Sequence, residues 1–191
     1  VMDDVYNSVS MYAKQDGDMV YAIGMTYDEL GGSHYYDLRG AVGNNAPLVH
    51  AAKARVVFDA LSKATAKGLV QAMHDCSEGG IGVCAAEMAF SGGLGMDIFL
   101  SEVPYKNKYS SEAPRNDFIL FSESNSRFLV EVNKDDKKEF EKILKAHAVP
   151  FGIVGCFNRS GEFKVWGLKE KLCLKAGLRE LKEAWQKPLR W

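Results

Sequence analysis

Short apolar runs of strand length alternate along this chain with longer segments whose apolar residues recur at helical spacing. Runs rich in β-branched and aromatic residues between turn signals are typical of strands, whereas apolar residues three and four positions apart are typical of amphipathic helices. The alternation predicts an α/β fold. We expect strands at residues 19–26, 69–73, 96–100, 118–121, 127–132, 151–157 and 163–166, and helices at 48–67, 81–90, 134–146 and 178–185.

The last two predicted strands affect the kind of sheet that we expect. Residues 151–157 and 163–166 flank a polar turn, and this pattern predicts a β-hairpin with antiparallel strands. The sheet should therefore not be purely parallel, and we predict a mixed β-sheet flanked by helices. Residues 27–47 are expected to form a loop, and residues 101–117 a polar surface excursion.

The composition is typical of one soluble globular domain. Of 191 residues, 47% are hydrophobic and 26% charged, which is enough apolar material for a core. The 24 Lys and Arg balance 25 Asp and Glu, whereas sequence-independent nucleic-acid binding needs clustered surplus cations. No apolar run approaches the roughly 20 residues of a membrane helix, and no signal peptide is recognised. We expect a cytoplasmic protein that binds neither nucleic acid nor membrane.

Four cysteines are present, without a CxxC pair or zinc-type spacing to histidine. Reduced, mostly buried thiols that pack as small hydrophobes are expected. Cys76 lies in a glycine-rich turn, but the sequence pairs it with no histidine dyad, so no catalytic role is assigned to it.

Three polar segments each adjoin a predicted strand, so we expect them to meet at one end of the sheet, where α/β proteins usually bind ligands. The first is residues 28–33. Its paired glycines should leave backbone amides uncovered for a phosphate or carboxylate. The alternative is a glycine turn that caps an element.

The second segment, residues 74–80, joins a strand to a helix through a glycine-rich turn, an arrangement that favours anions at the helix amino end. It has neither the Walker nor the GxGxxG spacing. Asp75 and Glu78 could bind Mg²⁺ or ribose hydroxyls. The alternative, that Asp75 or Ser77 caps the helix, is favoured by the local pattern. His74 is not proposed as a catalytic base.

The third segment, residues 120–127, places three serines, a carboxylate, an amide and a guanidinium close together. Arg127 could hold a phosphate through two hydrogen bonds. The alternative is an internal salt bridge from Arg127 to Glu123.

In this order and spacing, the three segments resemble the phosphoribosylformylglycinamidine synthase family, the ATP-dependent amidotransferases of purine biosynthesis. The matching residues are 17–36, 74–90 and 120–130, and residues 178–185 resemble the family's carboxyl end. The resemblance implies that residues 16–191 form a synthase-type C-terminal domain, similar to that of aminoimidazole ribonucleotide synthetase. Residues 1–15 would be a linker or the tail of a preceding ATP-binding domain, and the start at Val1 also suggests part of a larger protein.

The resemblance also implies the reaction. ATP activates the formamide oxygen of formylglycinamide ribonucleotide, and ammonia from a glutaminase domain or subunit then displaces phosphate. The catalytic histidine and the main ATP and magnesium ligands would lie in upstream domains, so no catalytic residue is expected in this chain, which alone should be inactive. Its expected partners are those upstream domains, the glutaminase and small accessory subunits, and a nucleotide ligand.

Two alternatives to this function remain. The chain could be a non-catalytic module that clamps a nucleotide, or the equivalent domain of another synthase in the same group. That group includes selenophosphate synthetase, thiamine-monophosphate kinase and a hydrogenase maturation protein.

The resemblance also implies which residues contact a nucleotide or substrate. Cys76 and Glu78 replace the family's commoner Leu and Asp, and Asn125 and Ser126 replace Gln and Gly. The candidate contact residues are Gly31, Gly32, Ser33, Asp75, Ser77, Glu78, Gly79, Gly80, Glu123, Ser124 and Arg127.

Overall fold

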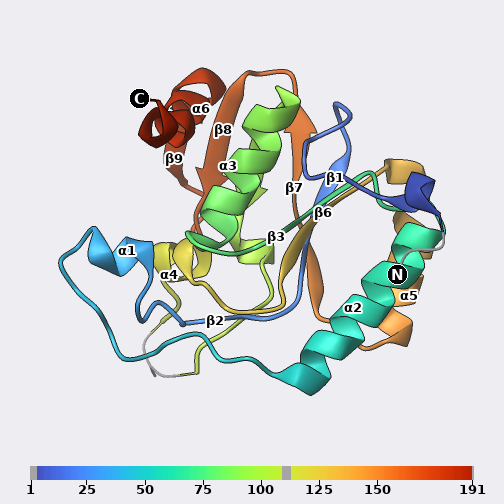
Figure 1. Ribbon diagram of the computed structural model, residues 1–191, viewed down its shortest axis with the longest axis horizontal. Helices are drawn as coiled ribbons and strands as arrows, with labels where there is room; N and C mark the ends of the chain where they lie inside the picture. The colour runs from blue at the N-terminus through green and yellow to red at the C-terminus, as the bar shows by residue number, and fades with distance from the viewer. Residues whose placement is uncertain (1–3, 109–112, 191) are drawn as a thin grey trace.

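The structure is a computed structural model that describes residues 4–108 and 113–190. Within them, seven strands form one mixed sheet with the order β3-β6-β1-β7-β4-β8-β9 (Figure 1). Neighbouring strands are antiparallel except β4 and β8, which are parallel. The predicted mixed sheet is thus confirmed. Its strands are β1 (Met19–Ile23), β3 (Ala72–Asp75), β4 (Gly95–Phe99), β6 (Phe128–Val132), β7 (Phe151–Asn158), β8 (Glu162–Trp166) and β9 (Leu172–Gly177).

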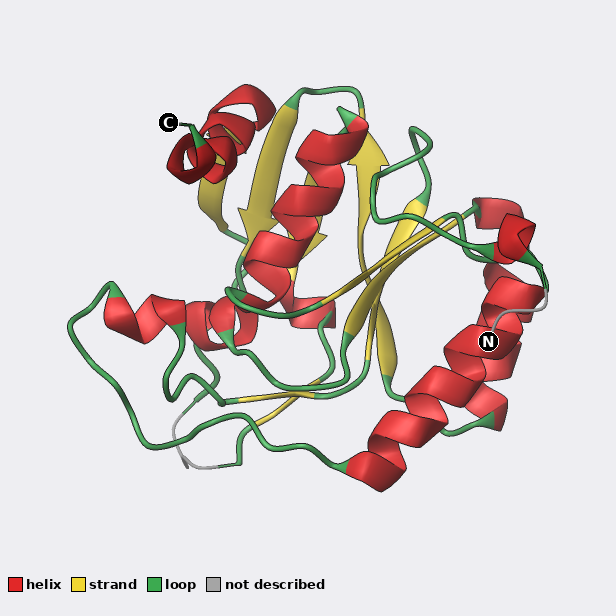
Figure 2. Cartoon of the chain, viewed as in Figure 1, coloured by secondary structure: helices red, strands yellow, loops and turns green. Residues whose placement is uncertain are grey.

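Helices cover both faces of the sheet in two groups, which Figure 2 shows on either side of the strands. Successive strand side chains point to opposite faces, so β1 contributes to two cores. Tyr21 and Ile23 lie in the core beneath α2 (Ala51–Ala66) and α5 (Lys137–Ala146). Val20 and Ala22 lie in the other core. The helices on that face are α3 (Gly80–Gly92), α4 (Asn116–Phe121) and α6 (Leu178–Gln186).

The predicted helices are confirmed with small changes at their ends. The α5 helix buries Phe140, Ile143 and Leu144, as its spacing predicted. The α2 helix begins at Ala51, three residues after the predicted start, and buries one apolar stripe along its length. That stripe consists of Ala54, Val57, Ala60, Leu61 and Ala64.

Several short elements complete the described chain. Two short strands pair in parallel and form a separate two-stranded sheet below the main one in Figure 1. They are β2 (Thr26–Tyr27) and β5 (Tyr105–Lys106). The remaining elements are the helix α1 (His34–Asp37) and the 3-10 turns Val5–Asn7, Leu100–Glu102, Lys134–Asp136 and Lys187–Leu189.

The prediction of a strand at residues 118–121 is wrong, because these residues form the end of α4. A short apolar run has no periodicity that separates a buried strand from a buried helix. Here the run packs against α3, and Ile119 and Leu120 are buried in the core that α3 covers.

The predicted hairpin of residues 151–157 and 163–166 is also wrong. Both segments are strands, but β4 lies between them, so β7 and β8 do not pair with each other. Met96 and Asp97 of β4 pair with β7 on one side and β8 on the other. The strand β9, which was not predicted, pairs with β8 at the edge of the sheet, and Lys175 on it is exposed.

Some predicted boundaries move. The strand predicted to continue to residue 26 ends at Ile23, because Gly24 takes a left-handed conformation with φ +93°. The strand predicted at residues 69–73 is shifted to Ala72–Asp75. The predicted excursion at 101–117 and the predicted lead-in at 1–15 fall partly on residues 109–112 and 1–3, which lie outside the described residues.

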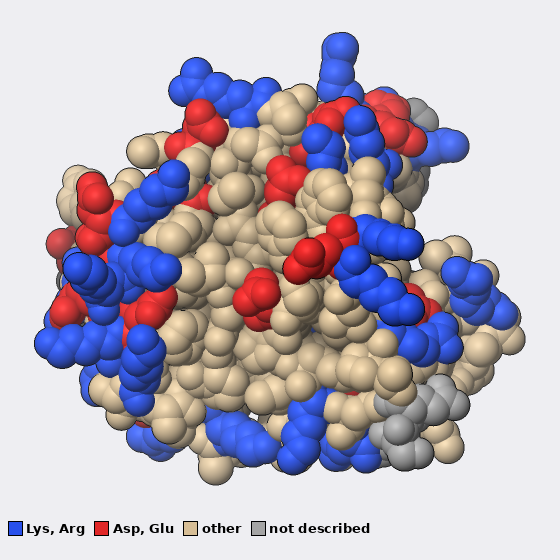
Figure 3. Space-filling model, turned by 180° about the vertical axis from the view of Figure 1, so that it is seen from behind, with Lys and Arg blue, Asp and Glu red and all other residues tan. Residues whose placement is uncertain are grey.

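The surface and the thiols agree with the composition. All four cysteines are free; Cys76 and Cys84 are buried, Cys156 is half-buried and Cys173 is exposed. On the face that Figure 3 shows, carboxylates lie near the centre and Lys and Arg mostly toward the margins, so charges of both signs are interspersed. In the described part of the chain, no helix has the length and apolar character that crossing a bilayer requires.

Candidate functional site

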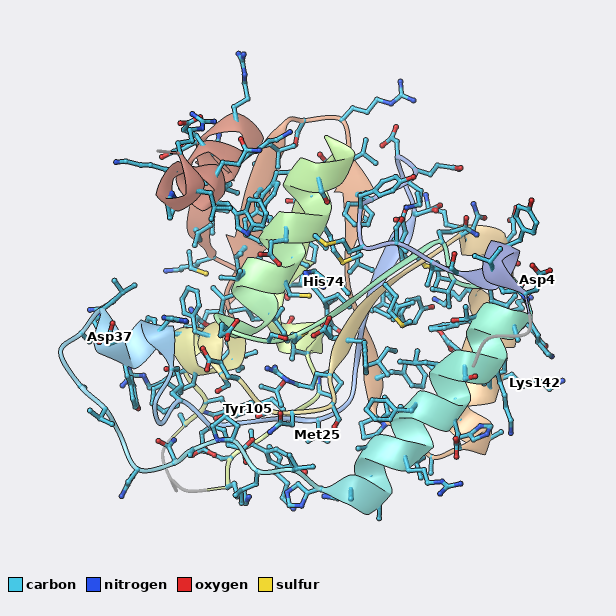
Figure 4. The ribbon with its side chains drawn as sticks, in the orientation of Figure 1. Asp4, Met25, Asp37, His74, Tyr105 and Lys142 are labelled. Carbon is cyan, nitrogen blue, oxygen red and sulfur yellow. The ribbon has the colours of Figure 1, made fainter. Side chains whose placement is uncertain are left out.

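The three polar loops predicted from the sequence meet beside the amino end of α3. The Glu123 amide donates to the carbonyl of Glu29 at 3.0 Å, which joins the third loop to the first. The Cys76 amide donates to the carbonyl of Arg127 at 2.9 Å, which joins the second loop to the third. Figure 4 shows His74 beside the lower part of α3, above Met25 and above Tyr105 of β5. Backbone hydrogen bonds thus assemble one site from three distant segments.

The Arg127 side chain lies at the junction of these loops and is only 2% exposed. Its Nε donates to the Ser124 carbonyl at 2.8 Å and its Nη1 to Thr26 Oγ1 at 2.9 Å, while Nη2 donates to the Ser122 carbonyl. Burial lowers the pKa of the guanidinium. All three nitrogens thus donate to neutral oxygens of the chain. The alternative of an internal salt bridge from Arg127 to Glu123 is therefore wrong, and the Glu123 carboxylate accepts from the Gly79 amide instead.

The amino end of α3 is approached by a carboxylate from another loop. Gly79 precedes the helix with φ +75°, and no side chain of its own turn caps the helix, so the predicted capping by Asp75 or Ser77 is wrong. Instead, the Gly79 amide donates to Glu123 Oε1 at 2.9 Å. This placement is favourable because the helix dipole stabilises negative charge at an amino end.

Asp75 and Ser77 bond to each other on the exposed side of this turn. Ser77 Oγ donates to Asp75 Oδ2 at 2.7 Å, and this bond lowers the pKa of the Asp75 carboxyl. Both residues are exposed, as is Glu78, and the Asp75 side chain keeps 65% of its surface accessible. Their oxygens are therefore accessible to a ligand from outside the chain.

His74 joins this turn to the carboxyl-terminal helix. Its Nε2 lies 2.6 Å from Glu87 Oε2, and Trp185 Nε1 of α6 donates to Glu87 Oε1 at 2.7 Å. His74 Nδ1 lies 3.5 Å from Asp75 Oδ1. The imidazole is thus held between two carboxylates, and the α6 helix is linked to the turn through it.

In the first loop, the amides predicted to be uncovered are bonded within the chain. The Gly31 amide donates to the Asn45 carbonyl at 3.1 Å and the Gly32 amide to the Val42 carbonyl at 2.7 Å. Ser33 is buried, and its Oγ accepts from the Tyr36 amide at 3.3 Å as the cap of α1. The alternative interpretation is therefore correct: this loop is a glycine turn, and its Ser33 caps α1.

Two acidic residues in the first loop were not selected from the sequence. Asp28 and Glu29 are both buried, at 1% and 0% exposure. The Lys108 amide donates to Asp28 Oδ1 at 2.8 Å, and Lys108 Nζ lies 3.5 Å from Glu29 Oε1. Their signal in the sequence was the position of two acids directly between a strand and a glycine pair. Thr26, the partner of Arg127, carried no such signal.

The arrangement of acidic residues also bears on a metal. Among residues 4–108 and 113–190, no three His, Cys, Asp or Glu side chains converge where a metal ion could bind. Asp75 and Glu78 offer hard oxygen ligands of the kind that Mg²⁺ prefers. They would need further ligands from water or another molecule.

Comparison with known proteins assigns this arrangement to a family. A family model described as AIR synthase related protein, C-terminal domain, matches residues 15–167. The phosphoribosylformylglycinamidine synthase subunit PurL of Cutibacterium acnes is 30% identical over 99% of this chain and 23% of its own length. The PurL subunit of Methanothrix thermoacetophila is 32% identical over 100% of this chain and 23% of its own. The chain thus spans about a quarter of the length of these curated relatives.

Solved structures show the same fold. Thermotoga maritima PurL complexed with FGAR matches 93% of this chain and 30% of its own, with a TM-score of 0.79 and 20% identity. Thermotoga maritima PurL complexed with ATP matches 93% of this chain and 27% of its own, with a TM-score of 0.73 and 21% identity. The predicted fold, that of a synthase-type C-terminal domain, is confirmed.

Proposed function

We propose that this chain is the C-terminal part of a phosphoribosylformylglycinamidine synthase. The chain belongs to the AIR synthase related protein family, because the model of that family's C-terminal domain matches it. The relatives that match nearly all of this chain are synthase subunits. The observation that carries the proposal is the meeting of the three segments that resemble this family. The Arg127 side chain bonds to the first and third segments, and its carbonyl accepts from the Cys76 amide of the second. The reaction would be the ATP-dependent amidation of formylglycinamide ribonucleotide with glutamine-derived ammonia.

In this function, the chain's own residues bind and orient, and the upstream domains carry the chemistry. ATP and Mg²⁺ would be held mainly by those domains, and ATP would supply the phosphoryl group that activates the formamide oxygen. Asp75 and Glu78 are exposed carboxylates whose oxygens fit ribose hydroxyls or a hydrated Mg²⁺. Gly79 and Gly80 form the buried turn that leads from these carboxylates into α3, and the Gly79 amide is bonded to Glu123.

The remaining candidates keep these groups in place. Glu123 and Ser124 bond to the backbone of the other two loops, and Arg127 holds the loop that carries both. Gly31, Gly32 and Ser33 fix the first loop next to them. We further propose that the protein acts in the cytoplasm with a glutaminase and a small accessory subunit as partners.

The test uses the longer polypeptide that carries this chain and, separately, the 191 residues alone. Formylglycinamide ribonucleotide, ATP, Mg²⁺ and ammonia are supplied, and amidine product and ADP are measured. The longer polypeptide should form both in equal amounts, and the 191 residues should form neither. Turnover by the 191 residues alone would overturn the division of roles, and activity on selenide or thiamine monophosphate instead would indicate another synthase of the group.

One observation favours a second function, a non-catalytic module that clamps a nucleotide. Arg127 is buried and bonded to three oxygens of the chain, which is the position of a structural residue. In the full-length enzyme, replacement of Arg127 or Ser124 would then lower stability and leave the intrinsic rate unchanged. A lower rate at unchanged stability would favour direct participation.

A further inference from the structure

Two of the four cysteines, Cys76 and Cys84, meet where β3 leads into α3. Cys76 directly follows β3, and Cys84 lies one turn into α3. Cys84 Sγ donates to the carbonyl of His74 at 3.7 Å, so its side chain points back from the helix toward the end of β3. The thiols of Cys76 and Cys84 also hydrogen-bond to each other. His74 is labelled in Figure 4 beside the lower part of α3.

Both thiols are enclosed by the core that α3 covers. Cys76 is 6% exposed and Cys84 is 2% exposed. The Cys76 amide donates to the carbonyl of Arg127 at 2.9 Å, which fixes the backbone beside its thiol. Since Cys84 is fixed by the helix itself, hydrogen-bonded backbone holds the contact between the two thiols from both sides.

The other two cysteines are not placed to pair with each other. Cys156 lies on β7 and Cys173 on β9, and the strands β4 and β8 lie between them. Neighbouring strands are about 4.8 Å apart, so these two thiols are several strand spacings from contact. A disulfide needs two sulfur atoms that reach each other without movement of the backbone. Cys76 and Cys84, whose thiols are in contact, meet this condition.

Cys76 is the thiol of this pair that an oxidant from solvent meets first. Its neighbours on both sides, Asp75 and Ser77, are exposed, so the thiol lies directly beneath the surface of the turn. Cys84 is on the buried side of α3, next to it. A sulfenic acid that forms beside a second thiol condenses with it to a disulfide. The arrangement is that of an oxidisable thiol with a resolving thiol in contact.

We propose that Cys76 and Cys84 form a reversible disulfide when the protein meets a peroxide, and that this bond ties the turn at residues 75–80 covalently to α3. In a reducing compartment, such a bond forms transiently and is broken again by thiols. The inference goes beyond the proposed function, because it requires neither a ligand nor the upstream domains.

The oxidation has two steps. The Cys76 sulfur attacks one oxygen of hydrogen peroxide, the O–O bond breaks, and hydroxide leaves with the thiol proton as water. The Cys84 sulfur then attacks the Cys76 sulfur of the sulfenic acid, the S–O bond breaks, and hydroxide leaves with the Cys84 proton as a second water. The two sulfurs together lose two electrons, which reduce the peroxide.

The test treats the polypeptide that carries this chain with hydrogen peroxide and then blocks the remaining thiols with iodoacetamide in denaturant. Trypsin and a glutamate-specific protease cleave it without reduction. Cleavage after Glu78 separates residues 68–78, which carry Cys76, from residues 79–87, which carry Cys84. Mass spectrometry should find these two peptides joined after peroxide, and separate again after dithiothreitol. No substrate is present, so this result and that of the amidation assay on the reduced enzyme are independent.

Three variants separate a reactive pair from two thiols that only pack in the core. Cys84→Ala should lose the joined peptides and leave Cys76 to oxidise to a sulfinic acid, which dithiothreitol does not reverse. Cys76→Leu should also lose the joined peptides. The matched control, Cys156→Ala combined with Cys173→Ala, removes the other two thiols and should leave the joined peptides unchanged.

The proposal is overturned if peroxide leaves both thiols open to iodoacetamide, or if Cys76 of the wild type becomes a sulfinic acid without any joined peptides. It is also overturned if dithiothreitol does not separate the peptides. The thermal midpoint of each variant is measured first. If Cys84→Ala or Cys76→Leu fails to fold, the wild type and the control still decide the outcome, because the joined peptides are observed directly in both.

Discussion

The guanidinium of Arg127 links segments that are about a hundred residues apart, since Thr26 and Ser124 both bond to it. A buried charge is costly unless it is fully bonded, and only the planar fork of arginine can donate in several fixed directions at once. The side chain therefore determines where the third loop lies relative to the first.

Replacement of Arg127 with lysine should lower the free energy of unfolding by about 3 kcal/mol or more, because an ammonium on a flexible stem leaves buried acceptors unbonded. Urea denaturation measures this. The matched control is Arg55→Lys, at an 82% exposed side chain, which should change stability by less than about 0.5 kcal/mol. Equal stability of both variants would contradict the role given to Arg127.

Glu131 is a further buried residue with an ionisable side chain, at 0% exposure, and it bonds to the backbone of the segment that precedes β1. Its carboxyl accepts from the amides of Lys14 and Gln15, both at 2.9 Å. Burial raises its pKa to about 7, with a further contribution from the charge of Asp18. The folded chain therefore binds this proton more tightly than the unfolded chain does.

Because the pKa of Glu131 is higher in the folded chain than in the unfolded chain, protonation of Glu131 stabilises the fold. This contribution to the free energy of unfolding is complete below the unfolded pKa of 4.5 and is lost as the pH rises to about 7. Wild type should lose on the order of 1–3 kcal/mol of this contribution across that window. Glu131→Gln should abolish that part of the dependence, whereas Glu139→Gln, at a side chain that is 43% exposed, should retain it. Parallel pH profiles of urea midpoints for wild type and Glu131→Gln would contradict the assignment.

Among the elements, α3 depends on a close approach at its amino end. Gly80 has φ +60°, and a Cβ there would overlap the carbonyl oxygen of Ser122. The helix can therefore contact the third loop only with glycine at this position.

Gly80→Ala should destabilise the fold by about 2–4 kcal/mol, since it combines left-handed strain with a steric clash. Gly93→Ala at the other end of α3 is the matched control: its φ is +71°, but no described atom lies within 4 Å of the added Cβ. This control isolates the strain, which costs about 1–2 kcal/mol. Equal losses in thermal or urea unfolding would show that the contact with Ser122 is unimportant.

The elements also show what a sequence can predict. The α5 helix was predictable because Phe140, Ile143 and Leu144 recur at helical spacing. The helix at 118–121 was not, because a four-residue apolar run fits either state and only its packing on α3 selects one. The position of β4 between β7 and β8 was equally hidden, since strand order depends on pairing between distant segments rather than on local turns.

For the whole molecule, the sequence correctly predicted that the three polar loops meet. The second and third loops adjoin β3 and β6 of the main sheet, whereas the first loop follows β2 of the two-stranded sheet. The sequence did not show how they meet. Gly31 and Gly32 were expected to offer free amides, yet distant carbonyls of Asn45 and Val42 accept those bonds. Arg127 was expected to face a ligand and is buried. A local pattern identifies a donor, but only the tertiary structure determines its acceptor.

The most direct test of the proposed function is hydrogen–deuterium exchange of the polypeptide that carries this chain, with and without formylglycinamide ribonucleotide and a non-hydrolysable ATP analogue. If the three loops form a wall of the synthase site, exchange should slow at residues 28–33, 75–80 and 122–127 when ligand is added. The edge strand β9 serves as the internal control and should not change. Unchanged exchange in all three loops, at ligand concentrations that saturate the enzyme, would contradict the account.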